Sequence, residues 1–267
     1  MKNTLSKIAL VTLLGSAITS CTKLEDINID PTAANDEQVR PEYFLNNSII
    51  GAQQDPEIAE RLFVYSWKTA AHQQYFNFLN IGQQSDEFNN IYWSRISGWL
   101  NNANSAIEIG QKKIENGTAT VSNANMMQVA RIWRAYLLSE LSDNFGPVPT
   151  KGFQGVNPEF DSVKDVYYYL LAELKDAQSK IDPTVAKEDI KNYDAAYGFN
   201  WDNWIRYANS MRMRLAMRLS EVDANKAKSE FEDAVKTNKY IDNASQNFGV
   251  QEKDGWDPLT GVMSRSW

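Results

Sequence analysis

Apolar side chains recur every three or four residues along most of the chain, with polar residues between them. This spacing matches the 3.6-residue turn of an α-helix, so each apolar series lies along one helix face. Strict alternation of apolar and polar residues, which indicates a β-strand, is almost absent. The apolar series predict helices at residues 56–74, 91–117, 124–146, about 162–182, 201–223 and 224–236.

Residues that favour the ends of helices stand at several of these boundaries. Ser162, followed three residues later by Asp165, resembles a capping box with Asp in place of the usual Glu or Gln. Gly117 is expected to end the helix at 91–117, because glycine adopts the left-handed conformation of a C-cap. Residues 146–149 read Gly-Pro-Val-Pro and predict an extended turn, because proline cannot continue a helix.

The order of these helices predicts an all-α protein. The clearest apolar stripe belongs to residues 201–223 and comprises Trp201, Trp204, Ala208, Met211, Leu215, Leu219 and Val222. Successive helices with short connections suggest tetratricopeptide-like helical hairpins, joined in places by long irregular loops. Residues 248–267 read as a loop, and no closing helix follows, although helical solenoids normally end in a capping element. We therefore expect the chain to be part of a longer protein.

The N-terminal residues have the layout of a bacterial lipoprotein signal. Lys2 and Lys7 form a short basic region, residues 8–18 form an apolar run too short to span a bilayer, and Cys21 follows. Cleavage before Cys21 would leave a cysteine that carries acyl chains, which anchor a protein in a membrane. The alternative is an ordinary secretory signal followed by a chance cysteine. We expect a signal peptide at residues 1–20, a polar tether at 21–40 and a helical domain at 41–267.

Composition narrows the classes of partner. Cys21 is the single cysteine, so the chain has no disulfide framework and no cysteine-based metal site. Loss of residues 1–20 removes two positive charges and moves the formal net charge from −7 to −9. An acidic chain of this kind argues against nucleic acid as a partner.

No catalytic constellation, metal site or cofactor motif is predicted. His72 is the single histidine, and we expect it to be structural rather than catalytic. The acidic pairs at 25–26, 86–87 and 188–189 could supply the two carboxylates of a glycosidase. With 34 acidic residues in the chain, however, such pairs are also expected on solvated surfaces.

Four arginines within one predicted helix form a basic cluster in an otherwise acidic protein. They are Arg206, Arg212, Arg214 and Arg218. The cluster is either a patch for an acidic ligand or a set of ion pairs to acidic residues on neighbouring helices. We favour the ion pairs.

The segment from His72 to Trp93 is the best candidate for ligand contact. Residues 75–90 are expected to form a loop that mixes aromatic rings with amides and carboxylates. Rings stack on the faces of sugars, and polar side chains bond to their hydroxyl groups. The candidate ligand residues are Tyr75, Gln83, Asp86 and Trp93. The alternatives are a surface loop held by its own aromatic residues and, for Trp93, a place in the core.

Four segments together resemble the SusD/RagB family of outer-membrane lipoproteins. They are CTKLEDINIDPT at residues 21–32, YWSRISGWLNNANSAI at 92–107, LSELSDNFGPVPT at 138–150 and WDNWIRYANSMRMRLAMRLSEVD at 201–223. Each resembles a family motif, and the four occur in the family's order behind a lipoprotein signal. The resemblance extends over the whole chain.

The resemblance implies a tetratricopeptide-like scaffold and a place on the outer surface of the cell. It also implies a partnership with a SusC-like TonB-dependent transporter, for which such proteins capture glycans or peptides without catalysis. Members of the family are usually much longer, so this chain would be the N-terminal portion of one. Two other functions stay open, which are a lipid-anchored glycoside hydrolase and a helical adaptor or truncated remnant without a small ligand.

Overall fold

The computed structural model describes residues 39–54, 85–152 and 159–250. The chain divides into residues 1–39 and a compact unit of residues 40–267, and every described helix belongs to the second unit. The α-helices of the described residues are α3 (Pro41–Gln54), α5 (Asp86–Glu115), α6 (Asn123–Phe145), α7 (Val163–Ser179), α8 (Trp201–Arg218) and α9 (Ala224–Lys236). These residues contain no β-strand, and the all-α class is confirmed.

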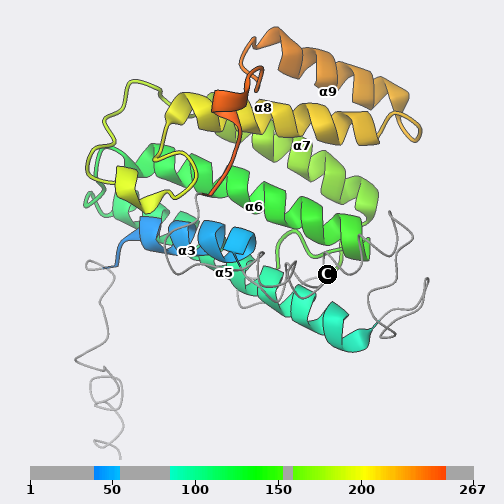
Figure 1. Cartoon of the computed structure of the whole chain (residues 1–267), viewed down its shortest axis with the longest axis horizontal. Coiled ribbons are helices and arrows are strands. Elements are labelled where there is room, and N and C mark those ends of the chain that lie inside the picture. The colour runs from blue at the N-terminus through cyan, green and yellow to red at the C-terminus, as the bar shows by residue number, and fades with distance from the viewer. Residues whose placement is uncertain (1–38, 55–84, 153–158, 251–267) are drawn as a thin grey trace, which may run out of the picture. The chain divides into compact units, whose positions relative to one another are not determined.

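Each helix packs against the next described helix along the chain, from α3 to α9. Successive helices run in opposite directions, so the unit is a stack of helical hairpins (Figure 1). The expectation of helical hairpins is therefore confirmed. Helix α6 also contacts α3 and α8, which makes it the centre of the stack.

Helix α6 is buried on more than one face. The apolar residues that recur every three or four positions along α6 are at most 1 % exposed: Met126, Val129, Ala130, Trp133, Leu137 and Leu141. Ile132, Ala135 and Leu138 lie off that series and are equally buried. A helix that is apolar on several faces belongs in the interior, and α6 accordingly has α5 and α7 as its main neighbours.

Helix α3 was not among the predicted helices. Leu45 and Ile49, which are one turn apart, are fully buried against the core. Between them, Ser48 links three helices, because its Oγ accepts a hydrogen bond from Nε1 of Trp133 at 2.9 Å and donates one to the carbonyl of Trp99 at 2.8 Å. The helix is therefore held by partners distant in sequence, which its own residues do not reveal.

The predicted helix ends are largely as expected. Oγ of Ser162 accepts a hydrogen bond from the N–H of Asp165 at 3.2 Å, as in a capping box, and donates to the carboxylate of Asp165 at 2.7 Å. Gly117 follows the end of α5 with φ of +70°, in the left-handed region. Val148 in the Gly-Pro-Val-Pro turn forms an antiparallel bridge with Asp161, which confirms that this turn is extended.

Three apolar residues of the predicted helices are exposed rather than buried, and all lie near the ends of helices. Ile114, Val163 and Val222 are 40 %, 41 % and 79 % exposed. Val222 is exposed because α8 ends at Arg218 and a turn leads from there into α9. An apolar series extended to the first or last turn of a helix therefore overestimates burial there.

The loop after α7 is organised by a buried carboxylate. The side chain of Asp194 accepts hydrogen bonds from Nε1 of Trp204 at 2.7 Å and from the N–H of Phe199 at 2.8 Å. Burial raises the pKa of Asp194, while these hydrogen bonds favour its charged form. The contact joins the loop to α8.

Several expectations lie outside the described residues, including the helix at 56–74 with His72 and the acidic pair at 25–26. Part of the expected C-terminal loop is described, and there Phe248 stacks on Trp133 with ring centroids 5.5 Å apart. That loop thus contributes to the packing around α6.

Removal of the Ser48 hydroxyl tests the link between α3, α5 and α6. In Ser48→Ala the indole N–H of Trp133 stays buried without its acceptor, so we expect the free energy of unfolding to fall by about 1–3 kcal/mol. The control is Ser97→Ala, since the hydrogen bond that Oγ of Ser97 makes among the described residues stays within its own helix, to the carbonyl of Trp93. Chemical denaturation would measure both, and equal losses would contradict the prediction.

Candidate ligand surface at the end of helix α6

Four aromatic rings gather where α6 ends, and we call them the Trp93 cluster. The ring of Trp93 meets that of Phe145 edge-on, with centroids 5.2 Å apart and an angle of 89°. Phe160 lies nearly parallel to Trp93, at 6.2 Å and 10°. Tyr92 packs against Phe145 at 5.9 Å. Phe160 is 58 % exposed and Trp93 is half-buried, so the cluster offers apolar ring surface to solvent.

The turn after α6 brings these rings together. Gly146 has φ of +83°, in the left-handed region that glycine adopts without strain, and its N–H bonds to the carbonyl of Ser142 at 2.8 Å. The extended residues that follow pair with Asp161, whose carboxylate also accepts the N–H of Thr150 at 3.0 Å. Phe160, the residue before Asp161, is thereby placed beside the end of α6.

Polar groups border the cluster on the α5 side. The side-chain amide of Asn144 donates to the hydroxyl oxygen of Tyr92 at 3.1 Å. Burial raises the pKa of Tyr92, and the nearby carboxylate of Glu140 raises it further, so the hydroxyl stays protonated. Rings next to hydrogen-bonding groups are suited to a ligand with both apolar faces and hydroxyl groups.

The structure describes two of the four predicted ligand residues. Both Asp86 and Trp93 belong to α5, seven residues apart and therefore on roughly the same face. Asp86 is exposed in the first turn of that helix. The prediction of a loop through residue 90 is wrong at its end, because α5 begins at Asp86. Tyr75 and Gln83 lie outside the described residues.

Trp93 packs against Phe145 at the edge of the core yet stays partly exposed, and its contact with a ligand stays a prediction. Sequence analysis missed Phe160. No periodic pattern marks this residue, and its one signal is its position two residues before the helix cap Ser162.

All four arginines of the cluster form ion pairs. Three of them pair with neighbouring helices, as favoured from the sequence, whereas Arg206 pairs within its own helix. Each guanidinium lies near a carboxylate: Arg206–Asp202 at 2.7 Å, Arg212–Glu230 at 3.0 Å, Arg212–Asp233 at 2.6 Å, Arg214–Glu140 at 3.6 Å and Arg218–Asp143 at 2.5 Å. Arg212 is completely buried between α8 and α9. These pairs engage each arginine within the fold, which leaves the patch for an acidic ligand without support.

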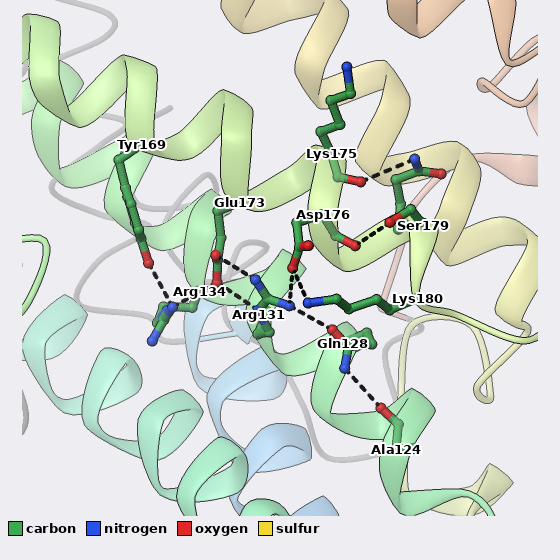
Figure 2. Close-up of polar contacts among 11 residues, drawn as sticks. Ala124, Gln128, Arg131, Arg134, Tyr169, Glu173, Lys175, Asp176, Ser179 and Lys180 are labelled. Carbon is green, nitrogen blue, oxygen red and sulfur yellow. Dashed lines mark hydrogen bonds and ion pairs between the residues drawn. The ribbon is translucent and has the colours of Figure 1, made fainter.

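A second charged network holds α7 against α6 (Figure 2). Arg131 binds the carboxylate of Glu173 through two hydrogen bonds, of 2.9 and 2.7 Å. Arg134 adds a third at 2.8 Å and also donates to the hydroxyl of Tyr169 at 2.7 Å. Burial alone would raise the pKa of Glu173, but the two arginines together lower it.

The carboxylates of the described residues do not form a metal cluster. No group of three or more His, Cys, Asp or Glu residues is arranged there to hold a metal ion. Asp86 and Glu87 point to solvent in the first turn of α5, as an ordinary acidic helix start does. Within the part of the chain that the structure covers, no helix has the length and apolar character needed to cross a membrane.

Comparison with known families identifies this chain. Residues 34–265 match the SusD-like family described as starch-binding and associating with outer membrane. Because the match includes most of the chain, the protein belongs to the SusD-like family, and the resemblance found in its motifs is confirmed. None of the curated proteins compared with the chain matches it.

Solved structures agree with this assignment. The Bacteroidetes AC2a SusD-like protein is 26 % identical in sequence, with a TM-score of 0.69. The match covers 80 % of this chain and 40 % of that protein's chain. A SusD homologue from Parabacteroides distasonis is 28 % identical with a TM-score of 0.64, over 78 % of this chain and 41 % of its own. A chitin-binding SusD homologue from Flavobacterium johnsoniae shares the fold, with a TM-score of 0.63 and 21 % sequence identity. The match covers 82 % of this chain and 48 % of the homologue. The chain thus spans about two fifths of the length of the first two.

The network between α6 and α7 makes stability depend on pH. In Glu173→Gln two largely buried arginines lose their carboxylate, so we expect a loss of about 3 kcal/mol at pH 7. The folded-state pKa of Glu173 is lowered, so its contribution is complete above the unfolded-state value of about 4.3 and disappears as the pH falls through the folded-state value.

Denaturation of wild type and variant at several pH values measures this difference. It should shrink below about pH 4. Glu108→Gln, which removes an exposed carboxylate from α5, is the control and should change stability little at any pH. A difference between Glu173→Gln and wild type that stays constant down to pH 2 would contradict the assignment.

Proposed function

We propose that this protein is a surface lipoprotein that binds glycans and passes them to a TonB-dependent transporter of the outer membrane. The observation that carries the proposal is the family match over residues 34–265, whose description names both starch binding and the outer membrane. The exposed rings of the Trp93 cluster supply a surface of the required chemistry. The chitin-binding relative is a further reason to test polysaccharides first.

Stacking on aromatic rings accounts for the binding step. One face of a sugar ring presents C–H groups, which pack on an aromatic face, while the hydroxyl groups at its edge need hydrogen-bond partners. Trp93 and Phe160 offer parallel rings, and the exposed carboxylate of Asp86 lies on the same helix face as Trp93. Tyr75 and Gln83 belong to the same proposed site, as part of the segment that leads into α5.

The chemistry proposed here is binding without catalysis. Hydrolysis of a glycan needs two carboxylates that face each other across the bound sugar. Two carboxylates close to the cluster in sequence already have partners: Asp143 is engaged by the guanidinium of Arg218 and the hydroxyl of Tyr167, and Asp161 accepts the N–H of Thr150. Release of new reducing ends from a glycan by the purified protein would support the glycoside hydrolase instead.

The anchor and the partner complete the proposal. Residues 1–20 serve as the signal peptide, Cys21 carries the acyl chains, and residues 21–40 form the tether. The partner is a SusC-like TonB-dependent transporter, and its recovery with the protein from detergent-solubilised membranes would test this point. Recovery without any transporter, together with absence of glycan binding, would favour an adaptor.

Substitution of exposed rings tests the glycan surface. Phe160→Ala and Trp93→Ala should weaken retention in native gels that contain soluble starch or glycol chitin, each by about fivefold for a stacking contact of about 1 kcal/mol. Tyr43→Ala is the matched control, because Tyr43 is 49 % exposed and lies in α3, outside the Trp93 cluster. Equal retention of all variants would remove the cluster from the site, and selective binding of peptides would change the ligand class.

Substitution of the anchor residue tests the location. Cys21→Ala should move the protein from the membrane fraction to the soluble fraction, because no acyl chains can then be attached. Thr32→Ala, in the same tether, should leave the distribution unchanged. Fractionation followed by immunodetection measures both, and a Cys21→Ala protein that stays with the membrane would refute the lipid anchor.

A further inference from the structure

A cavity of about 520 Å³ opens where α6 ends, α7 begins and α8 ends. These three helix ends lie together at one side of the stack (Figure 1). The volume falls within the range of about 300–1,000 Å³ that is usual for small-molecule sites. Helices that pack closely elsewhere leave this space unfilled, and we call it the α6–α8 pocket.

The α6–α8 pocket is separate from the Trp93 cluster, although both adjoin the last turn of α6. Phe145 packs toward α5, where Trp93 lies. Asp143, two residues earlier, lines the pocket and contacts Tyr167 of α7 and Arg218 of α8. The last turn of α6 therefore separates two surfaces.

Two neighbouring tyrosines of α7 line the pocket, and their hydroxyl groups are tied down. Tyr167 donates to the carboxylate of Asp143 at 2.5 Å, and Tyr168 donates to that of Asp223. Burial raises the pKa of Tyr167, and its hydrogen bond to Asp143 acts in the same direction. Because both hydroxyl groups are protonated and hydrogen-bonded, the two tyrosine rings have little freedom to move. This wall of the pocket is therefore preformed in the absence of ligand.

The charges of the lining balance one another. Arg218 lies 2.5 Å from the carboxylate of Asp143. Asp223 accepts the N–H of Lys226 as the cap of α9 as well as the hydroxyl of Tyr168. Lys164 is placed over the ring of Tyr168, 5.4 Å from its centroid. With two cations and two carboxylates in the lining, an ion of either sign meets a like charge as well as an opposite one.

We propose that the α6–α8 pocket binds a short uncharged saccharide, as a second glycan site beside the Trp93 cluster. This inference rests on the proposed function. The tyrosine rings and the apolar side chains of Leu219 and Val222 receive the C–H faces of the sugar. The lining carboxylates accept hydrogen bonds from sugar hydroxyl groups, and Lys164 and Arg218 donate them. A purely apolar ligand would instead leave these charged groups desolvated without partners.

The test blocks the pocket from its rim. Val222 lines the pocket and is 79 % exposed, so Val222→Trp adds bulk at the opening without a change in the core. Val121→Trp is the matched control, because Val121 is 75 % exposed and precedes the opposite end of α6. Isothermal titration of the whole chain with maltotriose, chitobiose and glucuronate measures the affinities.

We expect wild type to bind maltotriose or chitobiose more tightly than glucuronate. In Val222→Trp the Kd of the neutral sugar should rise about tenfold or more, whereas in Val121→Trp it should stay within about twofold of wild type. Three results would overturn the proposal: equal Kd values in both variants, tighter binding of glucuronate, or no binding of any of these probes. If the pocket fails this test but native gels still show retention by starch or chitin that depends on Trp93, the proposed function remains intact.

Discussion

The buried indole of Trp133 is the contact around which the described helices are arranged. It is fully enclosed, and its N–H needs an acceptor because an unsatisfied donor in the interior is costly. Ser48 of α3 supplies that acceptor and passes the hydrogen bond on to the backbone of α5. One side chain of α6 therefore determines where α3 lies and how α3 meets α5. The same indole also stacks on Phe248, from the segment beyond α9.

Charged pairs hold the outer helices to this centre. Arg131 and Arg134 of α6 share Glu173 of α7, and Arg212 of α8 is enclosed with two carboxylates of α9. Such pairs are costly to break, because the arginines would remain largely buried with their charges. Arginines that look like a ligand patch in the sequence are thereby engaged inside the fold. The surfaces proposed for a ligand lie at the ends of the helices and combine aromatic rings with polar groups.

The ends of antiparallel helices meet in a way that suits binding. At the end of α6, three successive residues point to different partners, with Asp143 toward α7 and α8, and Asn144 and Phe145 toward α5. The Trp93 cluster lies on one side and the α6–α8 pocket on the other. A stack of hairpins gathers such ends along one edge, so sites there combine side chains from several helices on a rigid support.

The linear sequence was sufficient for the class and for most helix bounds. Periodicity and caps act over a few residues, which is why α9 was predicted at the residues it occupies and why Ser162 and Gly117 were recognised as helix ends. Helix α3 escaped prediction because its stability comes from Ser48 and its distant partners. The pairing of Trp93 with Phe160 and the enclosure of Arg212 likewise depend on how the helices stack. Contacts between residues far apart in the chain follow from packing in three dimensions, on which a local pattern carries no information.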